Sequence, residues 1–203
     1  MKNIIPHIAL ILLLLFSCQQ ILIADEKNYK IIKLVNDQVI TNYDLQLRLK
    51  LYSTLNNVKI SKDNIDFIAK DMLSLMVDEK LQLEQIKKYK ISVDNSDIEN
   101  YIKQAYLGDD KSMQDLIFLL ESNDLNIDIL IRSIKIKLGW NKLASNLYYR
   151  TSEISKIDLE NEMSKNPTLS EKKARNILLS RQINLRAKKF LRDIKTEANI
   201  ENR

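Results

Sequence analysis

The sequence predicts a mainly α-helical protein, with a small β-hairpin near its start that a short C-terminal strand joins. Glycine and proline are scarce, with only two of each among 203 residues, and sheets or barrels need such residues at their many turns. Apolar residues also recur at helical spacing along most of the chain. The exception is residues 29–41, where two β-branched runs flank Asn36, Asp37 and Gln38 in a pattern typical of a hairpin.

Residues 1–24 have the pattern of a secretory signal peptide. Lys2 precedes an apolar run at residues 8–16, and Ala24 is acceptable before a cleavage site. Cleavage there removes His7 and Cys18, which are the only histidine and cysteine. The mature chain, residues 25–203, is then expected in the periplasm, without an imidazole base, a thiolate, a disulfide or a metal site of these ligands. The alternative is a lipoprotein signal, in which a lipidated Cys18 anchors the protein to a membrane.

Five helices are expected in the first three quarters of the chain, at residues 42–55, 61–89, 94–108, 112–122 and 126–148. Thr41 with Asp44 can cap the first, Ser61 or Asp63 the second, and Ser112 the fourth. In the fifth, Gly139 costs roughly 1 kcal/mol relative to alanine, which indicates a closely packed neighbour at that position.

Two more helices and a strand are expected after residue 150. Ser155 caps a short helix that ends near residue 164, and residues 166–170 around Pro167 form a joint. Thr168 with Glu171 forms a capping box for a last helix to about residue 195. Ile200 then lies in a short strand whose only available partner is the hairpin. We therefore expect the two ends of the mature chain to meet, with residues 25–166 as one domain that residues 167–203 complete.

The formal charge of +5 is concentrated near the C-terminus. From Glu171 onward there are ten Lys or Arg and four acidic residues. Such a basic helix indicates nucleic acid, an anionic membrane surface or simply a solvated face. Because an exported protein seldom meets nucleic acid, we expect no such partner. A solvated face is the favoured interpretation, and a transient contact between this helix and a membrane surface is the alternative.

Four segments occur in an order and spacing typical of one known family. They are IIKLVNDQVITNYDLQLRL, the helix at residues 76–85, ISVDNSDIENYI and IRSIKIKLGWNKL. Over residues 30–166, and more weakly over residues 174–200, the chain resembles the SurA-type periplasmic chaperones. In that family the N-terminal helices and the C-terminal helix form one module that holds unfolded outer-membrane proteins, with parvulin-type prolyl isomerase domains between them. Only residues 166–170 stand at that place here, so the resemblance implies a chaperone core without isomerase activity.

A chaperone of this kind would hold extended clients in an apolar groove, without nucleotide, metal or other cofactor. Unfolded outer-membrane strands alternate aromatic and polar residues, so Leu, Met, Tyr and Trp side chains could bind them without reading a sequence. Methionine, phenylalanine and tryptophan side chains of this kind belong to a core more often than to a client site. The tyrosines are better candidates, because a tyrosine can lie at the edge of a groove with its hydroxyl in water. The candidate peptide-binding residues are Leu47, Leu51, Tyr52, Tyr101, Tyr106, Met113, Phe118 and Trp140.

Two other classes of protein are alternatives. The first is a lipid-anchored envelope adaptor, for which a lipidated Cys18 is diagnostic. The second is an enzyme such as a peptidyl-prolyl isomerase, in which Glu160 with Glu162, or Asp78 with Glu79, would share acid–base work. Side chains at these spacings point in different directions on a helix, so catalysis is not expected.

Overall fold

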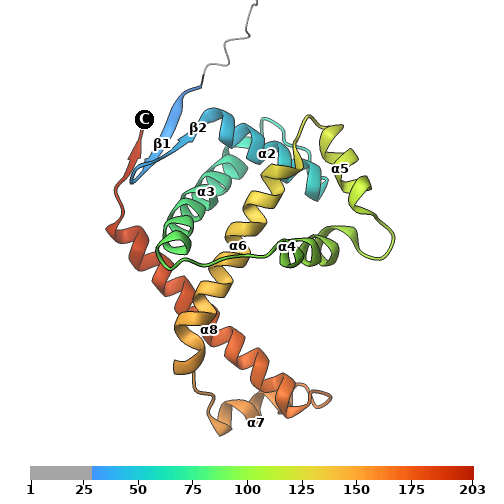
Figure 1. Cartoon of the computed structure of the whole chain (residues 1–203), viewed down its shortest axis with the longest axis vertical. Coiled ribbons are helices and arrows are strands. Elements are labelled where there is room, and N and C mark those ends of the chain that lie inside the picture. The colour runs from blue at the N-terminus through green and yellow to red at the C-terminus, as the bar shows by residue number, and fades with distance from the viewer. Residues whose placement is uncertain (1–28) are drawn as a thin grey trace, which may run out of the picture.

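The computed structural model describes residues 29–203, which form seven α-helices and one three-stranded sheet (Figure 1). The predicted signal peptide, with His7 and Cys18, lies outside the described residues. The predicted mainly helical fold class with a small sheet is confirmed. The strands are β1 (Ile31–Val35), β2 (Gln38–Thr41) and β3 (Ile200–Asn202), and the helices are α2 (Asn42–Asn56), α3 (Ile65–Lys88), α4 (Asn95–Ile102), α5 (Met113–Glu121), α6 (Ile127–Tyr148), α7 (Lys156–Lys165) and α8 (Glu171–Glu197).

The sheet joins the two ends of the described chain. Strands β1 and β2 form the predicted antiparallel hairpin, and Asn36 in its turn has φ 50°, a left-handed conformation that asparagine tolerates. Strand β3 pairs antiparallel with β1, with Val35 opposite Ile200. The backbone amide of Asn36 donates to the carbonyl of Asn199 at 2.8 Å, and the amide of Asn199 donates to the Asn36 side chain at 3.0 Å. The predicted meeting of the two ends is therefore confirmed.

Two predicted helix starts are correct in detail. Thr41 caps α2, where its side chain accepts from the amide of Asp44 and the carboxylate of Asp44 accepts from the amide of Thr41. Ser112 and Asp115 make the same reciprocal pair at the start of α5. Each pair satisfies amides that a first helical turn leaves without a partner.

Two other predicted caps are wrong. Thr168 does not cap α8, because it lies inside a turn that is closed by a hydrogen bond from the amide of Leu169 to the carbonyl of Asn166 at 2.9 Å. Ser170 is the N-cap instead, and its side chain accepts from the amide of Lys173. Helix α3 begins at Ile65 rather than at residue 61, because the residues before it form a turn in which the Asn64 side chain accepts from the amide of Ser61.

Helices α3 and α6 form the centre of the molecule. Helix α3 packs against α2, α6, α8 and the sheet. One group of buried residues lies between the sheet and α3 and includes Val35, Ile40 and Leu81, each 0 % exposed. A second lies between α2, α4, α5 and α6, and a third joins the ends of α3 and α6 to α8.

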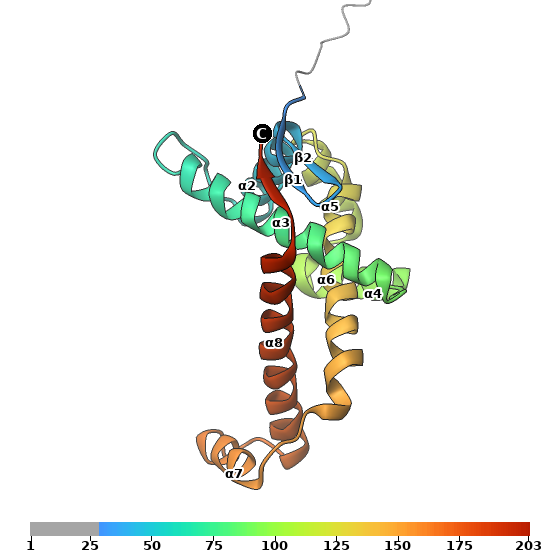
Figure 2. The same ribbon diagram turned by 90° about the vertical axis from the view of Figure 1, so that its left-hand side faces the viewer.

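The third group explains the glycine inside α6. A Cβ atom at Gly139 would lie 3.0 Å from Cδ1 of Ile86 on α3, so the Ile86 side chain packs directly on the glycine and the predicted close neighbour is confirmed. One residue along, the Trp140 ring stacks on Phe190 of α8 with centroids 5.6 Å apart. Figure 2 shows α8 beside the second half of α6, with the sheet at one end of α8 and α7 at the other.

Candidate functional site

The main candidate site is a pocket of about 370 Å³ between α2, α3, α4 and α6, which we call the α3–α6 pocket. Aliphatic and aromatic side chains from α3, α4 and α6 make up much of its lining, and charged and amide side chains complete it. The lining residues are Arg48, Leu75, Glu79, Gln82, Tyr101, Tyr106, Leu130, Ser133, Ile134, Ile136, Lys137, Trp140 and Asn141. The pocket thus combines an apolar wall with groups that can form hydrogen bonds.

Two tyrosines and a lysine form one side of the pocket. Tyr101 and Tyr106 meet edge to face, with ring centroids 6.4 Å apart. Lys137 on α6 donates to the hydroxyl of Tyr101 at 2.6 Å and lies 4.9 Å from the centroid of its ring. Burial, and secondarily the neighbouring Tyr101, raise the pKa of Tyr106 above its ordinary value of 10.0, so that Tyr106 keeps its proton at neutral pH.

A π-helical turn at Lys103–Leu107 brings the two tyrosines to the same side. In a regular α-helix, residues five apart point in directions that differ by about 140°. The wider π turn reduces this separation, so Tyr101 at the end of α4 and Tyr106 in the turn both reach the pocket. The turn ends at Gly108, which has φ 59° and is the last residue of the range predicted for this helix.

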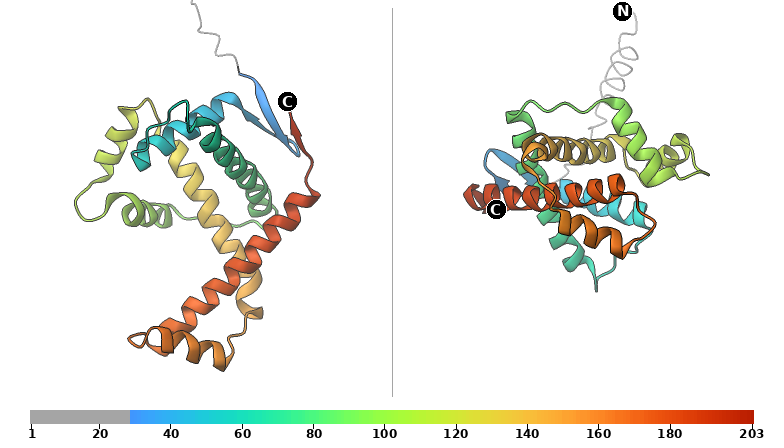
Figure 3. Two further views of the ribbon diagram at one scale, coloured as in Figure 1. Left: turned by 180° about the vertical axis from the view of Figure 1, so that it is seen from behind. Right: turned by 90° about the horizontal axis from the view of Figure 1, so that it is seen from below.

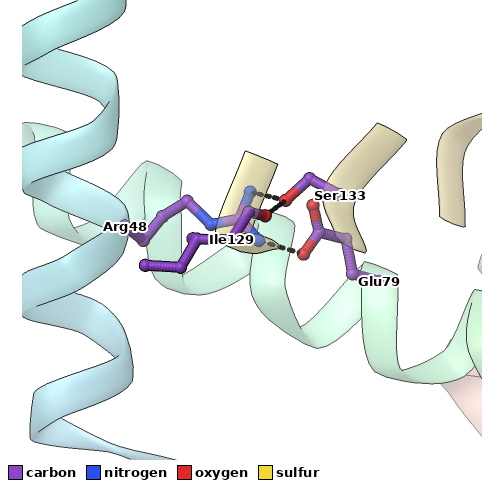
Figure 4. Close-up of polar contacts among 4 residues, drawn as sticks. All are labelled: Arg48, Glu79, Ile129 and Ser133. Atoms are coloured by element: carbon purple, nitrogen blue, oxygen red, sulfur yellow. Dashed lines mark hydrogen bonds and ion pairs between the residues drawn. The ribbon is translucent and has the colours of Figure 1, made fainter. Parts of the chain in front are cut away.

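The polar side of the pocket is built from three helices (Figure 4). Arg48 of α2 forms an ion pair with Glu79 of α3 and donates to the hydroxyl of Ser133 on α6 at 2.8 Å. Ser133 in turn donates to the carbonyl of Ile129 at 3.2 Å. Burial raises the pKa of Glu79 above its ordinary value of 4.5, although the Arg48 guanidinium acts in the opposite direction. A nearly buried ion pair therefore holds α2, α3 and α6 together at the pocket.

The α3–α6 pocket has two neighbours. A pocket of about 120 Å³ shares Arg48, Glu79 and Ser133 with it, so the ion pair lies between the two. Another of about 360 Å³ lies where the link after α3 passes α6. All three include Ile136 in their lining, which makes the first half of α6 the common wall of the hollowed surface.

Half of the predicted peptide-binding residues line these pockets. Tyr101, Tyr106 and Trp140 come together in the α3–α6 pocket, and Leu47 lines the smaller pocket beside it. Trp140 is only 8 % exposed because its ring is stacked on Phe190, so it contributes an edge to the wall.

The structure does not bring the other four predicted residues to this site. Leu51 is 4 % exposed and packs in the core between α2, α4, α5 and α6, which leaves almost none of its side chain for a client. Met113 packs against the same core from its edge, and Tyr52 is half-buried on α2. Phe118 is 73 % exposed on α5 and lines none of the three pockets.

Sequence reasoning did not name Arg48 or Ser133, and it considered Glu79 only as a catalytic partner of Asp78. The pattern gives one weak signal for them, since Arg48 stands between two leucines and Glu79 lies where the apolar stripe of its helix widens. A charge in such a position needs a partner when the helix is buried on several sides. The sequence does not identify the partner of either charge, because Arg48, Glu79 and Ser133 lie on three different helices.

The carboxylate pairs weighed for catalysis do not form shared sites. Asp78 turns to Lys195 of α8, with 2.6 Å between its carboxylate and the ammonium group, whereas Glu79 turns to Arg48 of α2. On α7, Glu160 faces Lys156 one turn away, and the buried Glu162 accepts from Arg181 of α8. In residues 29–203 no three His, Cys, Asp or Glu side chains come close enough to hold a metal ion.

No family model and no curated protein sequence matches the chain. Among the helices of residues 29–203, none has the length and apolarity that a bilayer crossing needs. The fold and its hollowed surface thus define a mainly helical protein with a partly open, aromatic-lined pocket.

Proposed function

We propose that this protein is an ATP-independent periplasmic chaperone that holds unfolded outer-membrane proteins, and that the α3–α6 pocket binds part of the client. The resemblance to the SurA-type chaperones suggests this function. A mainly helical module whose C-terminal helix and strand pack back on the N-terminal part is the arrangement that the resemblance implies. We also propose that residues 25–166 and 167–203 act as one unit.

The observation that carries the proposal is the composition of the pocket. An extended polypeptide offers apolar side chains together with backbone amides and carbonyls that need partners. Leu75, Tyr101 and Tyr106 supply the apolar surface, while the amides of Gln82 and Asn141 can both donate and accept. A site of this kind binds an extended chain weakly and with little dependence on its sequence, as a holdase requires.

Exposed apolar side chains, both at the pocket and on other helices, support the same function. Leu75 at the pocket is 45 % exposed, and Phe67, Phe118 and Ile157 on α3, α5 and α7 are each at least 70 % exposed. Scattered apolar residues can each make a weak contact with one long client, and linked weak contacts bind far more tightly than any single one.

The test is the aggregation of an unfolded outer-membrane β-barrel protein, followed by light scattering with increasing amounts of the purified chain. We expect suppression without nucleotide. Leu75→Asp should weaken it about tenfold, because it places a charge where the client's apolar groups would bind. Ser74→Asp is the matched control, since it adds the same charge at an exposed position one residue away that does not line the pocket.

Two results would count against the proposal. Aggregation that continues at a large excess of the chain would rule out a holdase. Equal effects of Leu75→Asp and Ser74→Asp would remove the pocket from the mechanism.

Two further measurements test the remaining proposals on class and location. A prolyl-peptide isomerisation assay should give no turnover above the uncatalysed rate. Mass spectrometry of the protein isolated from cells should give Asp25 as the first residue, whereas a lipidated Cys18 would indicate the envelope adaptor.

A further inference from the structure

The outer side of α8 carries cations without acids. Lys173, Ile177, Arg181, Leu185, Lys188 and Arg192 follow one another at steps of four or three residues, so they share one side of the helix, which we call the α8 outer face. All six are exposed, and the two apolar members, Ile177 and Leu185, are 39 % and 61 % exposed. The acidic residues of α8 fall outside this row.

Most of these charges are not neutralised within the protein. Among the described residues, Lys173, Lys188 and Arg192 form no ion pair or hydrogen bond through their side chains. Arg181 shares its charge with Glu162 of α7 at 3.2 Å but remains 55 % exposed. Lys195, which extends the row toward the sheet, is paired with Asp78. The free positive charge therefore lies on the part of α8 between its start and Arg192.

The spacing of the cations fits an extended anionic surface better than a single anion. From Lys173 to Arg192 the helix rises about 28 Å, so a compact anion could reach only one or two of the four cations. The two exposed apolar residues are about 12 Å apart along the axis and lie between cations. Figure 3 shows α8 at the outside of the part formed by α3 and α6, with α7 packed beside its first half.

We propose that the α8 outer face docks on a phospholipid surface that contains anionic headgroups, with the helix axis in the plane of the membrane. The Lys and Arg side chains lie among the phosphates, and Ile177 and Leu185 enter the headgroup layer. Helices with a basic polar border and exposed apolar side chains bind membranes in this way. None of the six residues lines the α3–α6 pocket, so this inference does not rest on the proposed chaperone function.

The test is binding of the whole chain to vesicles of phosphatidylcholine, with and without phosphatidylglycerol as a quarter of the lipid. Because each of the three unpaired cations is worth about fivefold in binding to such a surface, wild type should bind the anionic vesicles about a hundredfold more tightly, with an advantage that falls as salt is added. Each Lys or Arg near such a surface is worth about fivefold in binding, so Lys188→Gln with Arg192→Gln should reduce the advantage about 25-fold. Every variant begins at the same residue as wild type, so any contribution of the segment before residue 29 is common to all samples.

The matched control is Lys172→Gln with Lys189→Gln, which removes the same charge from exposed positions of α8 outside the row. It should keep most of the preference for anionic vesicles. Equal losses in both double variants would show that only net charge matters and would overturn the inference. So would wild-type binding that is the same on both vesicles, or binding of an acidic peptide through this face without any binding to vesicles. Circular dichroism of each variant establishes that the helices are intact.

Discussion

The contact between Gly139 of α6 and Ile86 of α3 allows a quantitative test of the packing. A methyl group at position 139 would lie 3.0 Å from Cδ1, 3.3 Å from Cγ1 and 3.4 Å from Cγ2 of Ile86. Ile86 is itself 8 % exposed and packs with residues of α6 and α8, so its side chain has little room to move away. Gly139→Ala therefore has two opposing effects on stability, which are a gain in helix propensity and a steric cost at the interface.

The magnitudes predict net destabilisation. Replacing glycine by alanine inside a helix gains about 1 kcal/mol, and adding a methyl group to a packed core costs about 1–3 kcal/mol. Gly139→Ala should therefore lower the free energy of unfolding by about 1 kcal/mol. Ile86→Val removes only Cδ1, the closest atom, and by itself should cost about 1 kcal/mol. In the Ile86→Val background the steric cost falls, so Gly139→Ala should be nearly neutral there.

Urea denaturation followed by circular dichroism measures all four proteins of this cycle. The expected coupling energy between the two substitutions is about 1 kcal/mol, with the double variant more stable than additivity predicts. Ser145→Ala, at an exposed position of the same helix, is the control and should not destabilise the protein. If Gly139→Ala raises the stability of the wild type, or if the two substitutions are additive, the close approach of α3 and α6 is not as described.

Three further predictions concern the core and two carboxylates. Leu81→Ala should lower the free energy of unfolding by about 3 kcal/mol in the same urea experiment, because Leu81 is 0 % exposed between α3 and the sheet. Burial, opposed by Arg48, raises the pKa of Glu79 in the folded state. The contribution of Glu79 to stability should therefore fall as pH rises from about 4.5 through the folded pKa. NMR titration should find a midpoint above 4.5, and Glu79→Gln should remove that titration. Hydrogen bonds from the side chain of Ser112, and to a lesser extent from its amide, lower the pKa of Asp115 below 3.8. The contribution of Asp115 to stability is therefore present above the unfolded pKa and is lost as pH falls through the folded pKa. Ser112→Ala should raise the Asp115 midpoint in an NMR titration.

Features that are encoded by neighbouring residues were predictable from the sequence. The hairpin needs two β-branched runs around Asn36 and Asp37, and the start of α2 needs only Thr41 and Asp44, so each fits within a few residues. The terminal strand was predictable for a different reason. A strand at Ile200 needs a partner, and the sequence offers only the hairpin as one.

Features that depend on contacts between distant segments were not predictable. The π turn before Gly108 departs from regular helical spacing, and no local sequence pattern predicts it. The ion pair of Arg48 with Glu79 joins residues from two helices that only the packing brings together. The apolar spacing on α2 and α5 also could not separate the buried Leu51 from the exposed Phe118, because both lie in runs with apolar residues on more than one side.

The pairing of β1 with β3 has a consequence for how the protein is made. Val35, which is fully buried, pairs with Ile200, which is synthesised some 165 positions later. While the ribosome is still producing α8, the nascent hairpin has an open edge and the apolar residues beneath it lack their last cover. During that interval the edge of β1 is exposed, and it is covered only after residues 200–202 have been synthesised and β3 pairs with it.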